Sequence, residues 1–517
     1  MKSQISKAQS IVTAAEMQVI ESRLFAAGMP VAALMEKVGQ RLVQTIEELF
    51  PHQAAADISI LAGPGHNGGD ALVVARELWE RGYRVKLHRP LKKAKDLTQS
   101  HCNYALYLGI PEISELEEWL RADCIIDGLF GFGLERPIEG SLAATVEQIN
   151  RSSTPVLSID IPSGLHTDTG EVLGAAIAAD HTLCLGLWKR AFFQEQALSY
   201  LGVSNLISFG IPVADQLAVL GNPPPLQTIP KPDFVRLLRR SPAAHKYQIG
   251  SALIVCGSST YPGAAILAAQ AARTTGVGML FVAVPGSIRD LVIGQVPDAV
   301  VIACPETPSG AIARLPSDFS LERVTAAAIG PGLTLDAAPV VIESLAWKMP
   351  LIVDADALNC LAQIDWRTRL QRQTPTILTP HWGEFKRLLP NVASSSAAQK
   401  GDRITMLTQS VLPPETTLVL KGAKTMVRGA RLQINRESTS ALARGGSGDV
   451  LTGIIAGVLA QNPDEPETVA AAAVWWHAQA ALLTQRTQTA AGVFPTKLIQ
   501  NLEPLLHLQH AEKIHEV

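Results

Sequence analysis

The sequence lacks the features of a disulfide-linked, zinc-binding, nucleic-acid-binding or membrane protein. Its 517 residues include six cysteines and no CxxC pair, which favours buried thiols in a reducing compartment. The net charge is −3, so there is no excess of basic side chains for nucleic acid. No stretch is long and apolar enough to span a bilayer, and residues 1–10 lack the apolar segment of a signal peptide. These absences predict a soluble cytoplasmic protein.

Apolar residues, in contrast, are abundant. They make up 47% of the chain, which is enough for large buried sheets, and 517 residues exceed what one hydrophobic core supports. Between Ile211 and His245 the pattern loosens, and the proline-rich runs 221–225 and 229–232 are typical of a stiff, extended connector. We therefore expect two domains, residues 1–222 and 223–517.

The first half alternates helices with strands that end in polar residues. Helical spacing from Ile11 to Phe50, broken at 28–30, predicts two helices, and an apolar strand at 57–62 leads into a glycine turn at 63–70. Two later strands end in Asp127 and Asp160. Each acid alone could be a turn or cap residue. Because open α/β sheets bind ligands at the carboxyl ends of their strands, Asn67, Asp127 and Asp160 together indicate a site.

Two further features of this half concern ligands. No acidic residue is clearly placed about 20 residues after the glycine turn to bind a ribose, which weakens an ordinary dehydrogenase interpretation. Oxygen ligands from Asn67, Asp127 and Ser163 would suit a cation with loose geometry.

The second half contains continuous apolar strands at 251–256, 279–284, 326–329, 351–353, 376–378 and 417–420. Runs of this kind separated by helical segments predict a parallel sheet covered on both faces, and residues 427–435 predict a hairpin. The fold class of both halves is therefore α/β, with three layers.

The glycine-rich run 445–453, Gly-Gly-Ser-Gly-Asp-Val-Leu-Thr-Gly, predicts a tight turn that leads into a helix N-terminus, where free N–H groups attract an anion. Asp449 could be an ordinary partner of the helix dipole. If a phosphate occupies the turn, the carboxylate would repel it and needs a chemical role. The natural role is to accept a proton from a hydroxyl that attacks the phosphate.

The combined motifs of the first half resemble the NAD(P)H-hydrate epimerase domain. The matching pieces cover nearly all of residues 10–215 and are Met17 with Glu21, Leu34-Met35-Glu36, GPGxNGGD at 63–70, 127–133 and 160–164. The resemblance implies a Rossmann-like domain that interconverts the R and S hydrates of NADH and NADPH. It implies a potassium ion at Asn67, Asp127 and Ser163. It places the hydrated nucleotide at His66, Asn67, Gly68, Gly69, Asp70, Gly131, Phe132, Gly133, Leu134, Glu135, Arg136, Pro137 and Asp160.

We expect the Asp160 carboxylate to relay protons while the C6 carbinol carbon of the hydrated ring opens and re-closes. Two positions depart from the family pattern: His66 replaces a usual asparagine, and Lys37-Val38 stand where the family often has Asn-Ala. They motivate an alternative in which this domain has lost catalysis and serves as a nucleotide-binding or assembly module.

The motifs of the second half resemble the ribokinase-like superfamily, and within it the ADP-dependent NAD(P)H-hydrate dehydratase. They follow the expected order at 245–250, 257–265, 330–333, 354–359, 380–384, 421–425 and 445–453, with departures at 437–444. The resemblance implies a ribokinase-like domain in which the adenine nucleotide contacts Lys421, Gly422, Ala423, Lys424, Thr425 and Gly448. Ala265, Gly332, His381 and Asp449 would contact the hydrated dinucleotide, and Asp449 occupies the place of the catalytic base.

The two resemblances together imply an enzyme that repairs hydrated NAD(P)H, with ADP as co-substrate, K⁺ in the first domain and Mg²⁺ in the second. The S hydrate is dehydrated at the expense of ADP, which leaves AMP and phosphate. The alternative is a ribokinase-like kinase of a small vitamin-precursor alcohol, fused to a non-catalytic nucleotide-binding domain. We also expect a homo-oligomer, because enzymes of this kind with apolar helices such as 264–275 often associate.

Overall fold

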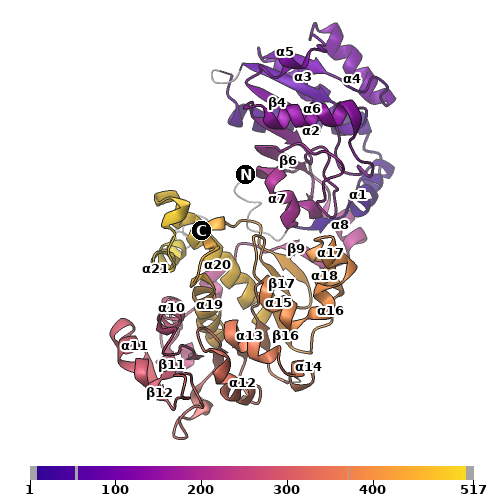
Figure 1. Ribbon diagram of the computed structural model, residues 1–517. Coiled ribbons are helices and arrows are strands. Elements are labelled where there is room, and N and C mark those ends of the chain that lie inside the picture. Colours follow the sequence, from indigo (N-terminus) through magenta and orange to yellow (C-terminus); the bar gives the residue numbers. More distant parts are fainter. Residues whose placement is uncertain (1–8, 53–55, 371, 508–517) are drawn as a thin grey trace. The chain divides into compact units, whose positions relative to one another are not determined.

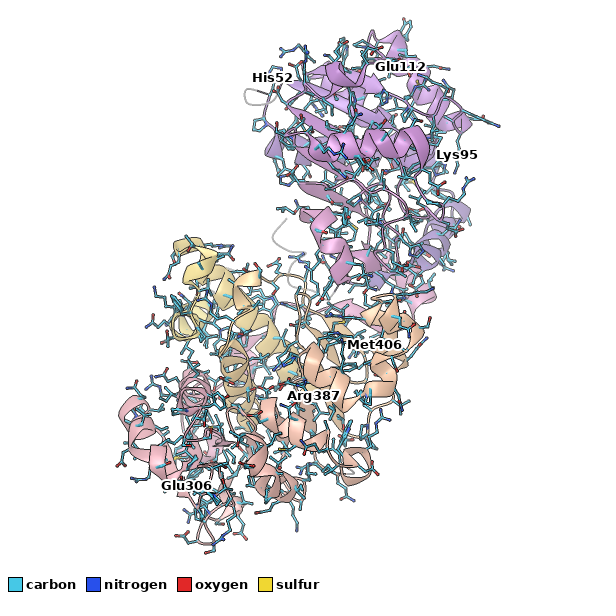
Figure 2. The ribbon with its side chains drawn as sticks, in the orientation of Figure 1. His52, Lys95, Glu112, Glu306, Arg387 and Met406 are labelled. Carbon is cyan, nitrogen blue, oxygen red and sulfur yellow. The ribbon has the colours of Figure 1, made fainter. Side chains whose placement is uncertain are left out.

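The computed structural model describes residues 9–52, 56–370 and 372–507, which form two compact units (Figure 1). The first unit contains Gln9–Leu226 together with Gln399–Ile404, and the second contains Gln227–Ala398 and the described chain from Thr405 onward. The division along the sequence thus falls after Leu226, within the proline-rich segment. Side chains fill the layers between ribbons in each unit (Figure 2).

The first unit is built on a six-stranded parallel sheet. Its strands lie in the order β3 (Arg84–His88), β2 (Asp57–Ala62), β4 (Cys124–Gly128), β5 (Val156–Ile159), β6 (His181–Leu185) and β8 (Val203–Ile207). The chain starts at β2, moves outward to β3 and then returns past β2 to β4. This reversal opens a crevice at the carboxyl ends of β2 and β4.

Helices cover both faces of this sheet. They are α1 (Ala14–Ala26), α2 (Val31–Leu49), α3 (His66–Glu80), α4 (Asp96–Tyr107), α5 (Leu116–Trp119), α6 (Gly140–Arg151), α7 (Leu198–Leu201) and α8 (Val213–Leu220). Alternate residues of β2 point to opposite faces, so Ile60 packs in the core beneath α2 and α3, whereas Leu61 joins Val146 of α6 in a second core. The result is a three-layer α/β unit of Rossmann-like type.

The two helices predicted between residues 11 and 50 are confirmed as α1 and α2. Ile11 and Val12, however, form a short strand, β1 (Ile11–Val12), that pairs in parallel with β7 (Trp188–Lys189). A two-residue strand is too short to produce a periodic pattern, and its partner lies far away in the sequence. This pairing fixes the backbone of Lys189, which becomes important at the site.

The second unit contains a ten-stranded sheet. The strand order is β12 (Val300–Cys304), β11 (Met279–Pro285), β10 (Ser251–Val255), β13 (Ala326–Ile329), β14 (Leu351–Val353), β15 (Thr376–Leu378), β16 (Thr416–Leu420), β17 (Met426–Arg428), β18 (Leu432–Ile434) and β9 (Leu226–Thr228). The strands from β12 to β16 are parallel, and β17 and β18 form the predicted antiparallel hairpin.

The direction of this sheet also reverses once, at β10, whose neighbours are β11 and β13. Right-handed crossovers on the two sides of a reversal place their helices on opposite faces. On one face α10 (Pro262–Thr274), α19 (Ser447–Gln461) and α20 (Pro466–Thr487) share a core with β10. The remaining longer helices are α11 (Arg289–Gln295), α12 (Ala338–Ser344), α13 (Ala355–Leu361), α15 (Trp382–Leu388), α18 (Arg403–Gln409) and α21 (Pro495–Gln500).

The segment 222–232 differs from a plain extended connector, because Leu226–Thr228 joins the edge of the second sheet beside β18. The Ile229 N–H donates to the carbonyl of Ile434, which extends this contact.

All six cysteines are buried and free, as the spacing predicts. In the described part of the chain, no helix is both long and apolar enough to cross a membrane.

Candidate functional site

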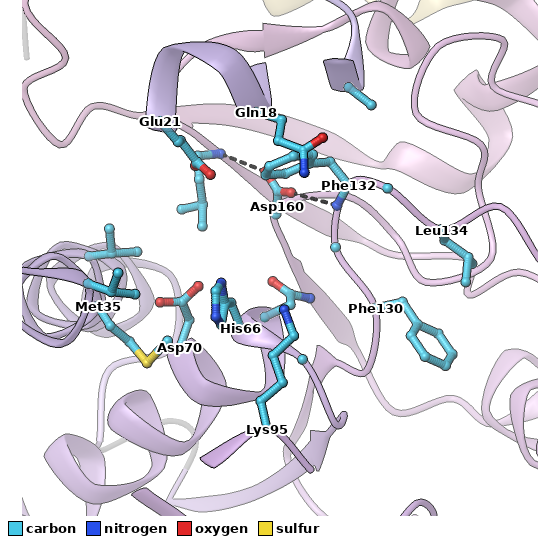
Figure 3. A pocket seen from close by; sticks show the side chains of 18 of the residues that line it. Gln18, Glu21, Met35, His66, Asp70, Lys95, Phe130, Phe132, Leu134 and Asp160 are labelled. Carbon is cyan, nitrogen blue, oxygen red and sulfur yellow. Dashed lines mark hydrogen bonds between the residues drawn. The ribbon is translucent and has the colours of Figure 1, made fainter. Parts of the chain in front are cut away.

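The first candidate site is a cavity of about 970 Å³ at the crevice beside β2 and β4. It is lined by α1, α2, the start of α3 and the loop that follows β4. The side chains of Glu21, Asp70 and Asp160 reach into it from three different elements (Figure 3). A cavity of this size with a few converging polar groups is typical of a small-molecule site.

Asp160 follows β5 and is held in an unusual backbone conformation, with a φ of 68°. Only 2% of the residue is exposed, and its carboxylate accepts the N–H of Phe132 at 3.0 Å and that of Leu185 at 3.3 Å. It also forms an ion pair with Lys189. A positive φ in a non-glycine residue is strained, and such residues are concentrated at functional sites. The backbone conformation, the two N–H groups and the lysine together hold this carboxylate at the cavity.

Lys189 is the partner that sequence reasoning missed. It is fully buried, and its ammonium group also donates to the carbonyl of Leu185 at 2.6 Å. Burial lowers the pKa of Lys189, but the charge and hydrogen bond of Asp160, together with the charges of Cys184 and Glu21, raise it above its ordinary value. Lys189 does not line the cavity, so it acts on the site through Asp160. A charged residue inside an apolar run, 182–193, was the one signal in the sequence.

Two other carboxyl groups at the cavity are held in the protonated form more strongly than usual. Burial and the nearby Asp160 charge raise the pKa of Glu21 to about 7, although Lys189 acts in the opposite direction. Burial and the same Asp160 charge, followed by Glu21, raise the pKa of Asp70 well above its ordinary value. The cavity thus contains carboxyl groups in different environments, a pattern that separates acids from bases.

The predicted nucleotide-contacting residues fall into two groups. His66, Asn67, Asp70, Gly131, Phe132, Gly133, Leu134, Glu135, Arg136 and Asp160 line the cavity. Pro137, Gly68 and Gly69 are not among the lining residues. Gly68 lies against the backbone of Gly63, where a Cβ would come within 1.9 Å of the carbonyl oxygen, so its role in the turn is close packing.

The three residues predicted to hold a cation lie around the ends of β2 and β4. The Ser163 hydroxyl donates to Asp127 Oδ1 at 2.6 Å, and the Ser163 N–H donates to Oδ2 at 2.9 Å. Asp127 is fully buried, and burial raises its pKa, while these hydrogen bonds act against that shift. Both side-chain amide atoms of Asn67 are buried without a hydrogen-bond partner. Because a buried amide seldom remains unsatisfied, this orphaned oxygen fits a cation ligand.

The second candidate site lies at the N-terminus of α19. Gly446 adopts a left-handed conformation with a φ of 90°, and the helix begins at Ser447, so Gly448 and Asp449 are in its first turn. First-turn N–H groups have no preceding helical carbonyl to bind. The turn predicted from the glycine run is therefore present, and its amides are available to an anion.

A cluster of charges surrounds Asp449. Lys421 Nζ donates to Asp354 Oδ1 at 2.7 Å and lies 3.9 Å from Glu384 Oε2, and the Thr452 hydroxyl donates to Asp354 Oδ2 at 2.6 Å. Burial and the repulsion from Asp354 raise the pKa of Asp449 to about 7, although Lys421 lowers it. This carboxyl is therefore poised near neutrality, which suits a general base.

The turns that follow the central strands bring the other predicted residues to this edge of the sheet. The Gly257 N–H donates to the Pro331 carbonyl at 2.8 Å, which joins the turns after β10 and β13. Ala265 is buried close to Gly257, and Gly332, with a φ of 66°, is packed against Ala264 and Tyr261.

His381 caps α15. Its Nδ1 accepts the Gly383 N–H at 2.9 Å, and the Glu384 carboxylate accepts the His381 N–H in return. A backbone bridge pairs His381 with Lys421, which places it beside the charge cluster.

The predicted nucleotide segment 421–425 leaves β16 on the same side. An atom placed at the Cβ position of Gly448 would lie 3.4 Å from Lys421 Nζ, so Lys421 reaches the glycine turn. Burial, followed by the charge of Arg436, lowers the pKa of Lys424 to about 8. No sequence motif pointed to His477. Its Nε2 donates to the Ser447 carbonyl at 2.9 Å, and burial lowers its pKa to about 4. His477 thus supports the turn as a neutral side chain.

Comparison with known proteins matches both units. The family model for NAD(P)H-hydrate dehydratase matches residues 252–504, and the model for the YjeF-related protein N-terminus matches residues 31–191. The bifunctional NAD(P)H-hydrate repair enzyme of Thermosynechococcus vestitus is 49% identical over 98% of this chain and 99% of its own length. The enzyme of that name from Synechocystis is 47% identical over 96% of this chain and 94% of its own length.

The chain belongs to the bifunctional NAD(P)H-hydrate repair enzymes. Among solved structures, an ADP/ATP-dependent NAD(P)H-hydrate dehydratase from Bacillus subtilis, co-crystallised with ATP and Mg²⁺, is 30% identical over 52% of this chain and 93% of that chain, with a TM-score of 0.43. The full-length relatives favour a bifunctional repair enzyme over the kinase alternative.

Proposed function

We propose that the second unit dehydrates the S hydrate of NAD(P)H at the expense of ADP, and that the first unit interconverts the R and S hydrates. The observation that carries the proposal is the glycine turn at α19, where the half-buried Asp449 carboxyl, with a pKa of about 7, stands next to the first-turn backbone amides and the Lys421 ammonium. An anion site with a base beside it suits transfer of a phosphoryl group to a hydroxyl.

The dehydration has two chemical steps. Asp449 takes the proton of the C6 hydroxyl while the hydroxyl oxygen attacks the terminal phosphorus of ADP. The bond from that phosphorus to the bridging oxygen breaks, and AMP leaves. The ring nitrogen then expels phosphate from C6, and loss of a C5 proton restores the dihydronicotinamide. The turn amides and Lys421 stabilise the charge on the transferring group, and positioning supplies much of the remaining rate.

Mg²⁺ is the metal we propose for the second unit. Among the described residues, no three His, Cys, Asp or Glu side chains are arranged to hold a metal. Mg²⁺ fits such a site, because it is commonly bound by one or two carboxylates with substrate phosphates and water. Asp449 is the nearest carboxylate to the turn, and the ion would supply charge neutralisation on the phosphates.

We propose K⁺ for the first unit, with Asn67, Asp127 and Ser163 as the residues that hold it. The orphaned Asn67 amide oxygen supports this assignment, as does the wholly oxygen-based donor set. The ion would order the loop after β4. In the epimerisation itself, Asp160 accepts the hydroxyl proton of the hydrate, and its ion pair with Lys189 holds the carboxylate in position for that purpose.

Asp449→Asn tests the dehydratase proposal. The amide keeps the shape of the side chain but cannot accept the proton, so we expect ADP and hydrate to bind as before while turnover falls about 10²- to 10⁴-fold. Calorimetric titration measures binding, and phosphate release measures turnover. Unimpaired turnover would contradict the role of Asp449. A stable phosphorylated product formed from ATP would instead support the kinase alternative.

A further inference from the structure

The carboxyl group of Glu21 has no role in the proposed function, although it faces the reacting end of the first cavity. Glu21 lies on α1, lines the cavity and points into it (Figure 3). Within the described part of the chain, its carboxyl group takes part in no hydrogen bond or ion pair. Glu21 is half-buried, so its carboxyl group remains open to a ligand in the cavity.

Opening a carbinolamine ring requires two proton transfers. The hydroxyl on C6 must lose its proton while the C6–N1 bond breaks, and N1 must gain a proton as it receives the electron pair. Asp160, which pairs with Lys189, can accept the first proton. Lys189 does not line the cavity and donates instead to Asp160 and the Leu185 carbonyl, so it does not supply the second proton directly. A second, protonated group across the cavity would let both proton transfers occur together.

We propose that Glu21 is the proton donor that works opposite Asp160, an assignment that rests on the proposed epimerase function. In ring opening, Asp160 takes the hydroxyl proton, C6 becomes an aldehyde, and Glu21 protonates N1. The aldehyde turns about the C5–C6 bond. In re-closing on the other face, N1 attacks C6 and returns its proton to Glu21, and Asp160 returns its proton to the oxygen. Both carboxyl groups end as they began, so no further reactant is needed.

The surroundings of Glu21 favour this role. The charged groups that face it are Lys189 on β7, Asp160 after β5 and Asp70 on α3, and the other titratable residues on the cavity wall are His66, Lys95, Glu135 and Arg136. Burial and Asp160 raise the pKa of Glu21 to about 7, so it can both give and regain a proton near neutrality. Asp70 is the other candidate, and burial, followed by the charges of Asp160 and Glu21, raises its pKa well above the ordinary value.

The test is the interconversion of purified R hydrate by the full-length protein without ADP, so that the dehydratase is idle. The wild-type rate should fall as the pH rises through about 7, because Glu21 then loses its proton. Glu21→Gln should lower kcat about 10²- to 10³-fold with little change in KM, and the residual activity should lose this alkaline decline. Glu21→Asp should recover part of the rate and the alkaline decline. Glu48→Gln, on the exposed side of α2, is the matched control.

Each other outcome has a distinct meaning. If Glu21→Gln kept the wild-type rate and pH profile, the proposal for Glu21 would be overturned. If Asp160→Asn nevertheless lost activity in that case, the epimerase function itself would still stand. Loss of the alkaline decline in Asp70→Asn but not in Glu21→Gln would make Asp70 the donor and also overturn the proposal. No interconversion by the wild-type protein, with the spontaneous rate subtracted, would contradict the epimerase function itself.

Discussion

The two acids at the centre of the proposed chemistry are controlled by different neighbours. Asp160 is paired with a buried lysine and two backbone N–H groups, which stabilise its ionised form. Asp449 is buried near the like charge of Asp354, while Lys421 is bonded to Asp354 rather than to Asp449. One acid is therefore held by a lysine and two backbone amides, and the other has a pKa near neutrality.

The dehydration rate should increase with pH through about 7, because Asp449 acts only in its ionised form. Asp354→Asn removes a negative charge that raises the pKa of Asp449, so we expect the midpoint of the pH–rate profile to move to lower pH. The rate on the plateau should also fall, because Lys421 loses its partner. The measurement is phosphate release from ADP and S hydrate as a function of pH. Asp336→Asn, on the exposed turn before α12, is the control. A midpoint of the pH–rate profile that is unchanged or higher in Asp354→Asn would contradict the account.

The sequence points to a site residue most readily where a polar side chain follows a strand or a glycine turn. Asp160 and all of residues 131–136 line the first cavity, and Asp449 lies in the first turn of α19, while their functional roles stay predictions. Lys189 was missed because its importance depends on β1 pairing with β7, a contact that no local pattern reveals. Asp354 received no role of its own from the sequence, because its bond to Lys421 joins the ends of two different strands.

At the scale of elements, the second site depends on a turn whose backbone glycine adopts most readily. Gly446 precedes α19 with a φ of 90°, and a Cβ there would lie 2.7 Å from Leu267 Cδ1. The glycine run in the sequence predicted this turn, and the helix begins inside the run, at Ser447, three residues before the first apolar residue, Val450. Element boundaries shift in this way because caps and turns, rather than apolar periodicity, determine them.

Gly446→Ala should destabilise the second unit and its nucleotide site. The left-handed backbone costs a residue with a Cβ about 1–2 kcal/mol, and the contact with Leu267 adds to that cost. We expect a lower Tm and weaker binding of ADP, measured by thermal unfolding and calorimetry. Gly445→Ala is the matched control, since a Cβ at Gly445 meets no heavy atom within 4 Å. Equal effects of the two substitutions would contradict the role of the turn geometry.

At the scale of the whole molecule, two α/β units each place their site beside the strand where the sheet reverses direction, β2 in the first and β10 in the second. Alternating apolar strands and helices were sufficient to predict this architecture. The short edge strands β1 and β9 were not predicted, because each has only two or three residues. Homo-oligomerisation and location in the cytoplasm stay predictions, and the six buried free thiols fit a reducing compartment.

The most direct test of the central claim is the fate of a mixture of R and S hydrates given to the full-length protein with excess ADP. The wild-type protein should convert both epimers to the dihydronicotinamide, whereas Asp160→Asn should convert the S share at the wild-type rate and leave the R share to spontaneous epimerisation. Chromatography of the two epimers over time measures both. A wild-type protein that leaves the R hydrate untouched, or an Asp160→Asn protein that consumes it at the wild-type rate, would contradict the account.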